Sequence, residues 1–105
     1  MLKSSFGLQY YIEIIKNNLS ELQNFGLKRI GIFGSIVTGK PNQDSDLDIL
    51  IEFEVSKNTY KNLLSIHDLL QNLFTQKIDL VTKDGLSKHI KDSVLNEVVY
   101  IEASS

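Results

Sequence analysis

Apolar residues recur every three to four positions in the first quarter of the chain, and this spacing predicts an amphipathic helix. The helix begins near Leu8 and ends near Asn24, where Gly26 is expected to stop it. The same periodicity predicts a second helix over Thr59–Phe74 and a third over Leu86–Glu97. Each of the three has one apolar side with which it can cover a sheet.

Short runs of branched apolar residues lie between these helices and predict strands. They cover Lys28–Phe33, Leu47–Glu54, Lys77–Thr82 and Val99–Ile101, the last as a short edge strand. The order of elements predicts an α/β (α+β) fold in which helices flank one sheet. The sheet is expected to be a mixed β-sheet, because the link between the first two strands is too irregular for a crossover helix.

Length and composition limit the classes of protein that fit. With 105 residues, the chain is interpreted as a single domain, 1–105. Its 13 acidic and 11 basic residues give a net charge of −2, which disfavours general nucleic-acid binding but not a local phosphate site. The absence of cysteine excludes disulfides, cysteine-based zinc sites and cysteine nucleophiles. No apolar run approaches the roughly 20 residues that cross a bilayer, so we expect a cytoplasmic protein without a membrane partner.

Aspartates alternate with other residues at the start of the second predicted strand. Asp44, Asp46 and Asp48 stand two apart, and residues two apart in a strand face the same side. Two carboxylates at such a short distance repel each other unless a cation lies between them, and Mg²⁺ is a natural partner for such oxygen ligands. Asp79 is a further carboxylate inside an apolar strand, a costly position unless it is paired or binds a cation. The alternatives are an exposed acidic turn for the first group and a solvent-facing edge-strand charge for Asp79.

Two familiar motifs come close to this segment and fail. An EF-hand loop that started at Asp44 would need glycine and glutamate where this chain has Ile49 and Val55. A P-loop has the glycine and lysine spacing of residues 34–40, but Pro41 stands where the metal-binding serine or threonine belongs. Neither motif therefore accounts for the segment.

A combined pattern accounts for it better: Gly34-Ser35, ten residues, then Asp46-Leu47-Asp48. Two small residues and two aspartates at these offsets arise by chance in roughly one sequence in a thousand. Glycine has no side chain, so the backbone N–H groups at Gly34-Ser35 can approach a phosphate closely. The next strand would bring the metal-binding aspartates alongside them.

With these motifs, the chain resembles the minimal nucleotidyltransferase (MNT) family of the DNA polymerase beta-type nucleotidyltransferase superfamily. The resemblance covers nearly the whole chain and is carried by residues 32–35, 44–53, 77–82 and 85–87. It implies the nucleotidyltransferase fold and a two-metal transfer of a nucleotide from a triphosphate to a hydroxyl. Pyrophosphate is the leaving group in that reaction.

The resemblance also assigns roles to residues. It implies that Asp46, Asp48 and Asp79 are the catalytic and metal-binding residues, and that Gly34, Ser35 and Lys40 bind the nucleotide. Mg²⁺ would be the cofactor and ATP the substrate, with Asp79 acting either as the base or only as a ligand. One departure stands out: many family members have a basic residue just before the next glycine, and this chain has Thr38 there. Lys40, one residue beyond Gly39, is a flexible substitute for a fixed arginine.

The smallest members of the family are commonly antitoxins paired with a helical HEPN ribonuclease toxin, onto a tyrosine of which they transfer AMP. The resemblance therefore implies a protein adenylyltransferase that forms a hetero-oligomer with a HEPN-domain toxin. Two alternatives stay open: an antitoxin that neutralises the toxin by binding alone, and nucleotidyl transfer to a small molecule. The helix-spaced pair Lys88 and Lys91 is typical of a solvated face but could meet an acidic or phosphate-bearing partner.

Overall fold

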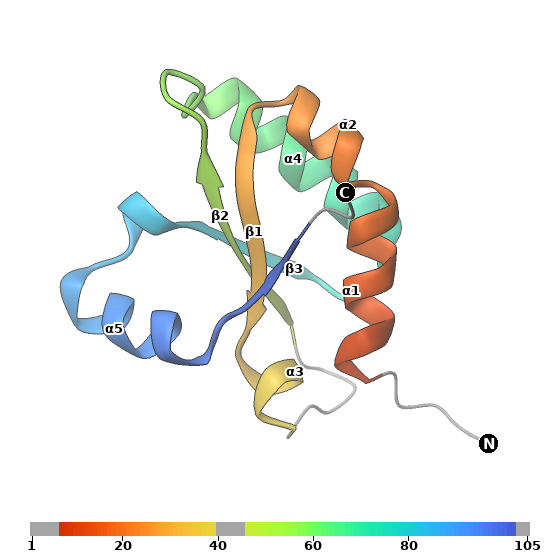
Figure 1. The fold of residues 1–105 in the computed structure, drawn as a ribbon, viewed down its shortest axis with the longest axis vertical. Coiled ribbons are helices and arrows are strands. Elements are labelled where there is room, and N and C mark those ends of the chain that lie inside the picture. Colours follow the sequence, from red (N-terminus) through yellow and green to blue (C-terminus); the bar gives the residue numbers. More distant parts are fainter. Residues whose placement is uncertain (1–6, 40–45, 103–105) are drawn as a thin grey trace.

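The computed structural model describes residues 7–39 and 46–102, in which helices and strands alternate in an α/β arrangement (Figure 1). The helices are α1 (Leu8–Asn17), α2 (Leu19–Asn24), α3 (Ser35–Thr38), α4 (Tyr60–Leu73) and α5 (Lys88–Glu97), with a 3-10 turn η1 (Lys83–Gly85). The strands are β1 (Leu27–Phe33), β2 (Leu47–Phe53), β3 (Ile78–Thr82) and β4 (Val99–Ile101). No helix in the described part of the chain is both long and apolar enough to span a membrane.

The four strands form one mixed sheet in the order β3-β2-β1-β4. β1 pairs antiparallel with both β2 and β4, whereas β2 and β3 run parallel. The prediction of a mixed sheet flanked by helices is therefore confirmed. The antiparallel pairing of β1 and β2 explains why their connection needs no crossover helix.

One face of the sheet carries the main core. The alternating β1 residues Ile30 and Ile32 and the β2 residues Ile49 and Ile51 are fully buried there. They form one cluster with apolar residues of α1, α2 and α4, such as Ile15, Leu22, Ile66 and Leu70. Figure 1 shows these three helices together on one side of the sheet. The branched side chains that predicted the strands thus pack one face of the sheet against these helices.

The other face is partly covered by α5, which lies away from α1, α2 and α4 (Figure 1). Leu50 on β2 and Val94 on α5 are both buried but do not belong to the main cluster. A Cβ on Gly31 would overlap Cγ2 of Val98, which follows α5 directly, so the α5–β4 junction lies against β1. Asp48 and Glu52, which lie on this face toward the two ends of β2, are only partly buried.

The structure corrects two predicted elements. The single helix expected from Leu8 to Asn24 is two helices, because Asn18 leaves helical geometry and its side-chain amide donates to the Ile14 carbonyl at 2.8 Å. A one-turn helix, α3, was not expected after β1. The predicted stop at Gly26 is confirmed: this residue follows α2 with φ of +88°, a conformation that glycine adopts without strain.

Candidate active site

The site begins where β1 ends. Gly34 follows the last residue of β1, has φ of +81° and forms the N-cap of α3, which Ser35 opens. Thr38 and Val37 both donate their backbone N–H to the Gly34 carbonyl at 3.0 Å, which fixes the turn. The first N–H groups of a helix have no acceptor within the helix, so this turn directs donors outward. The Gly34-Ser35 pair therefore stands at the end of a strand, as the sequence predicted, and at the start of a one-turn helix, which it did not predict.

Asp48 lies beside this turn on the neighbouring strand. The register pairs Phe33 of β1 with Asp48 of β2, and Asp48 in turn with Asp79 of β3. A Cβ on Gly34 would overlap Oδ2 of Asp48, so the carboxylate rests directly on the glycine backbone. Only glycine at this position leaves space for Asp48, which explains the Gly-Ser and Asp-x-Asp motifs as one packed unit.

The sheet brings the predicted carboxylates together. Asp79 is exposed on the edge strand β3, as the alternative of a solvent-facing charge predicts. It is also the cross-strand neighbour of Asp48, as expected for a paired carboxylate. Asp46 is the residue immediately before β2, where Leu47 anchors the strand by donating its N–H to the Lys77 carbonyl at 2.9 Å. The predicted residues Lys40 and Asp44 lie outside the described residues.

The electrostatic consequence falls on Asp48. Its pKa is raised from 3.8 to about 6, first by burial and then by the charge of Asp79 and a hydrogen bond with the Asp79 side chain. The charges of Asp46 and Glu97 raise the pKa further. Three carboxylates thus act on a fourth, Asp48, with no described lysine or arginine among the causes of the shift. Such a site is stabilised by a bound cation.

Glu97 is a member of this group that the sequence did not reveal. It is the last residue of α5, and its Oε2 accepts a hydrogen bond from the Gly34 N–H at 2.9 Å. Nothing in the spacing of Glu97 marks it, because the two residues are 63 positions apart in the chain. Only the packing of the α5–β4 junction on β1 brings it to the site.

The fit to Mg²⁺ rests on the chemistry of these donors. Among the described residues, no three histidine, aspartate or glutamate side chains are already arranged around a metal position. The carboxylate oxygens are nevertheless the ligand type that Mg²⁺ prefers, and burial and the neighbouring carboxylates both raise the pKa of Asp48. The residues present therefore fit a divalent cation.

Comparison with known proteins decides the family. The Nucleotidyltransferase domain family matches residues 12–101, a span that contains every described residue of the site. The chain belongs to this nucleotidyltransferase family. Its members are nucleotidyltransferase enzymes, and the resemblance inferred from the sequence is confirmed. A similar protein, the protein adenylyltransferase MntA of Thermococcus cleftensis, is 40% identical over 79 residues, which cover 75% of this chain and 79% of the relative.

Solved structures agree on the nucleotidyltransferase fold. One described as a minimal nucleotidyltransferase has a TM-score of 0.77 at 29% identity and covers 92% of this chain and 98% of its own. A toxin–antitoxin structure with AMP-PNP has a TM-score of 0.66 at 19% identity, covering 86% and 74%. A complex of tri-AMPylated Shewanella oneidensis HEPN toxin with MNT antitoxin has a TM-score of 0.61 at 17% identity, covering 89% and 73%. At these lower identities the likeness shows the fold alone.

Within this nucleotidyltransferase, the departure at Thr38 is visible in the structure. Thr38 is exposed at the end of α3, and its hydroxyl donates to the Ser35 carbonyl at 3.4 Å. A basic residue in its place would lie one helical turn from Gly34-Ser35. The described part of the turn therefore offers backbone donors without an adjacent fixed cation.

Proposed function

We propose that this chain is a Mg²⁺-dependent protein adenylyltransferase that transfers AMP from ATP to a tyrosine hydroxyl of a HEPN ribonuclease toxin and thereby acts as its antitoxin. The observation that carries the proposal is the packing of Asp48 against Gly34 and beside Asp79. The 40% identity to a protein adenylyltransferase supports the reaction, and the AMPylated HEPN toxin bound to an MNT antitoxin of the same fold supports the partner.

In the proposed reaction, Asp46, Asp48 and Asp79 hold Mg²⁺, which supplies charge neutralisation for the triphosphate. The oxygen of the acceptor hydroxyl forms a bond to the α-phosphorus, and the bond between that phosphorus and the pyrophosphate oxygen breaks. Asp79 is exposed beside Asp48, so its carboxylate can reach an incoming hydroxyl and accept its proton. A role as metal ligand alone is the other possibility for Asp79.

The glycine turn is proposed to bind the phosphates. The N–H groups at Gly34 and Ser35 lie at the start of α3, where the first N–H groups of a helix have no acceptor within the helix and can stabilise an anion. The Gly34 N–H is donated to Glu97, so this donor becomes available to a phosphate only when Glu97 withdraws. Lys40 would add a cation beyond Gly39, in place of the basic residue missing at Thr38.

Label transfer tests the proposal. The chain is incubated with Mg²⁺, ATP labelled on the α-phosphate and a purified HEPN toxin from the same genome. We expect label on the toxin, and at least about 100-fold less in Asp48→Asn, since carboxylates that position metal and phosphate supply most of the rate. Asp68→Asn, which removes an exposed carboxylate from α4, is the matched control and should keep full transfer.

A second function, neutralisation by binding alone, is favoured by one pair of observations. The turn lacks a fixed cation at Thr38, and Glu97 occupies its Gly34 donor. Toxin inhibition without label, unchanged in Asp48→Asn, would establish this alternative and overturn the proposed transfer. Label on a small hydroxyl compound instead of the toxin would establish the third candidate function, nucleotidyl transfer to a small molecule.

A further inference from the structure

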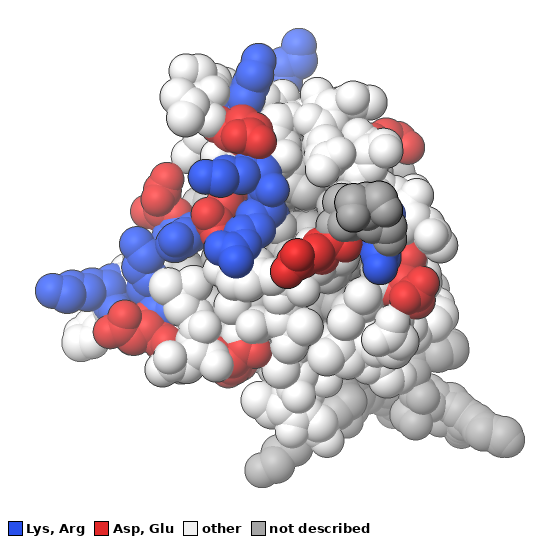
Figure 2. All heavy atoms as spheres, in the orientation of Figure 1, with Lys and Arg blue, Asp and Glu red and all other residues white. Residues whose placement is uncertain are grey.

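A hollow of about 590 Å³ lies away from the candidate active site, between α2, the start of β1 and the end of β4. Its charged lining consists of Lys28, Arg29, Lys83, Glu52 and Glu102. A smaller hollow of about 190 Å³ adjoins it across β2 and η1 and shares Lys28, Glu52 and Lys83. Figure 2 shows lysine and arginine side chains gathered on this part of the surface, with single acidic residues among them.

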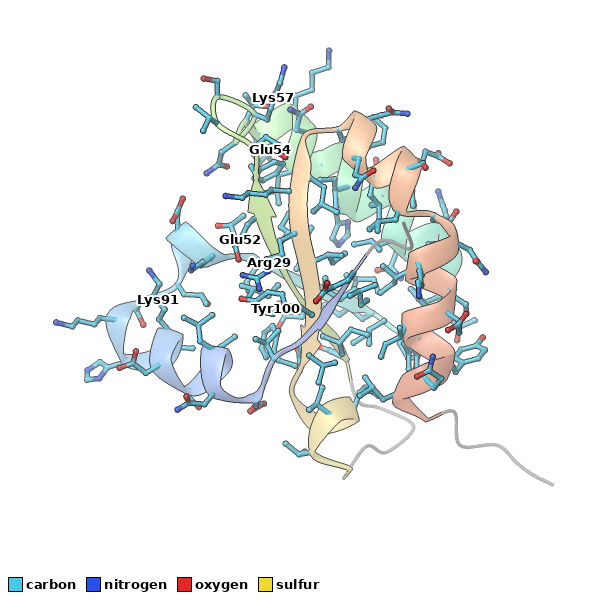
Figure 3. The ribbon with its side chains drawn as sticks, viewed as in Figure 1. Arg29, Glu52, Glu54, Lys57, Lys91 and Tyr100 are labelled. Carbon is cyan, nitrogen blue, oxygen red and sulfur yellow. The ribbon has the colours of Figure 1, made fainter. Side chains whose placement is uncertain are left out.

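Arg29, the arginine of this hollow, is held in a fixed orientation. Its guanidinium carbon lies 3.7 Å from the centre of the Tyr100 ring, a cation–π contact. The strands enforce it, because Arg29 pairs with Glu52 across β1 and β2 and Tyr100 pairs with Gly31 across β1 and β4. Figure 3 shows Arg29, Glu52 and Tyr100 clustered on neighbouring strands. Arg29 is therefore oriented before any partner arrives.

The hydrogen-bonding capacity of Arg29 is not used up. Its Nη1 is 3.8 Å from Glu52 Oε2, beyond the 2.7–2.9 Å of a direct charge-assisted hydrogen bond, and its side chain is 51% exposed. Guanidinium groups bind carboxylates through two parallel N–H donors, which a stacked arginine can present without further ordering. A second carboxylate can thus bind to the exposed edge of Arg29.

The balance of charge in the hollow also favours an anionic ligand. Glu52, whose side chain is only 15% exposed, is approached by both Arg29 and Lys83, the latter at 4.0 Å. Lys28 is exposed and forms no ion pair with a described residue. The larger hollow therefore has three cations against two carboxylates, the largely covered Glu52 and the exposed Glu102, in a chain whose net charge is −2. This local excess runs against the overall sign of the protein.

The position of the hollow relates it to the active site. Glu52 follows Asp48 by four residues on β2, so both side chains project from the same face, about 13 Å apart. The α5–β4 junction, with Val98 over Gly31, lies between the two places. A protein that brings a hydroxyl to Asp48 and Asp79 is therefore wide enough to contact the hollow as well.

The carboxylates in the hollow favour a protein over a nucleic acid as the ligand. Glu52 and Glu102 line the larger hollow, and Asp84 lines the smaller one. A phosphodiester strand carries a charge at every step and would face these groups, whereas a protein segment places single carboxylates where the cations are.

We propose that this hollow is the docking site for an acidic segment of the acceptor protein, with Arg29 binding a carboxylate and Lys28 and Lys83 flanking it. The identification of the partner as the acceptor rests on the function proposed above. The hollow thus adds a contact that selects the acceptor rather than one that transfers AMP.

Binding of a defined probe to the full chain tests the proposal. The probe is an eight-residue peptide of alternating glutamate and glycine, and the control peptide has glutamine in place of each glutamate. Binding is followed by NMR of the ¹⁵N-labelled protein. We expect the acidic peptide alone to shift the Arg29 side-chain N–H and the backbone signals of Lys83 and Tyr100. The variant Arg29→Gln with Lys83→Gln should weaken binding at least about fivefold, as the loss of two exposed charge contacts implies. Lys16→Gln, which removes a cation from α1, should not.

Three results of the binding measurements would overturn the docking site: equal shifts with both peptides, unchanged affinity in the double variant, or tighter binding of a twelve-nucleotide single-stranded RNA at the same residues. The peptide assay contains neither ATP nor an acceptor tyrosine, so it does not depend on catalysis. If the peptide binds but no HEPN toxin is labelled, the proposed function fails and the docking site stands. If the toxin is labelled with a KM that Arg29→Gln leaves unchanged, the docking site fails and the function stands.

Discussion

Gly34 donates its backbone N–H to Glu97 Oε2 at 2.9 Å, so a carboxylate from the end of α5 occupies a donor at the turn between β1 and α3. A carboxylate and a phosphate oxygen are both anionic acceptors, and they compete for the same N–H. The charge of Glu97 also raises the pKa of Asp48. One contact therefore links the proposed phosphate-binding turn, the carboxylate group and the α5–β4 junction.

This contact leads to a prediction for Glu97→Gln. The glutamine variant keeps an oxygen that can accept from Gly34 but loses the charge that opposes a triphosphate. We expect Mg²⁺ with a non-hydrolysable ATP analogue to bind up to about fivefold more tightly, the size expected for one partly exposed charge. Isothermal titration calorimetry measures the affinity, with Glu54→Gln, an exposed residue directly after β2, as the control. Unchanged or weaker binding would show that Glu97 does not oppose the nucleotide.

Gly34→Ala should destabilise the fold more than Gly39→Ala. Both glycines have positive φ, of +81° and +83°, but only Gly39 is in the left-handed helical region, where alanine costs about 1–2 kcal/mol; Gly34, with ψ of −154°, is in a region that is essentially restricted to glycine. Only at Gly34 would the new Cβ also overlap Asp48, because nothing lies within 4 Å of a Cβ on Gly39. Urea unfolding should therefore show a larger loss for Gly34→Ala.

A double variant separates the overlap from the backbone cost. Asp48→Ala removes the oxygen that a Cβ on Gly34 would meet first, while the Asp48 Cβ stays at 3.2 Å. Gly34→Ala should thus cost less stability in an Asp48→Ala background than in the natural chain. Equal costs in the two backgrounds would mean that the carboxylate does not rest on the glycine.

The sequence predicted the strands and most of the helices because branched apolar residues and helical periodicity act locally. It also predicted the Gly34–Asp48 relationship, since a small residue at a strand end and a carboxylate on the next strand form a recognisable pattern. The break at Asn18 was not visible, because the apolar spacing continues through it and a side-chain hydrogen bond decides the geometry. Glu97 could not be predicted, because its role depends on a contact across 63 residues.

Mg²⁺ should stabilise the natural chain against heat, and this effect should be lost in Asp48→Asn. A ligand that binds only the folded state raises the melting temperature with its concentration. Removing one carboxylate takes away a ligand and relieves repulsion, so we expect the variant to melt at or above the temperature of the metal-free natural chain. Differential scanning fluorimetry with and without Mg²⁺ measures both effects, and Asp68→Asn should behave like the natural chain. A full Mg²⁺ response in Asp48→Asn would remove Asp48 from the metal site.

The metal-free protein should become less stable as pH rises from about 4 to about 6. The pKa of Asp48 is about 6 in the folded chain against 3.8 for a free side chain, so within this window the folded state holds a proton that the unfolded state has lost. The free energy of unfolding falls with pH wherever the folded state binds more protons, and the contribution of Asp48 levels off above about pH 6. Urea unfolding in EDTA at about pH 4 and about pH 7 measures this loss of stability.

The variant Asp48→Asn removes the titrating group, so its stability relative to the natural chain should be greater at the higher pH. Asp79→Asn should lower the upper limit of this pH range, because the charge and the hydrogen bond of Asp79 help to raise the pKa of Asp48 in the folded chain. A natural chain whose stability relative to Asp48→Asn is the same at both pH values would show that the neighbouring carboxylates do not hold a proton on Asp48.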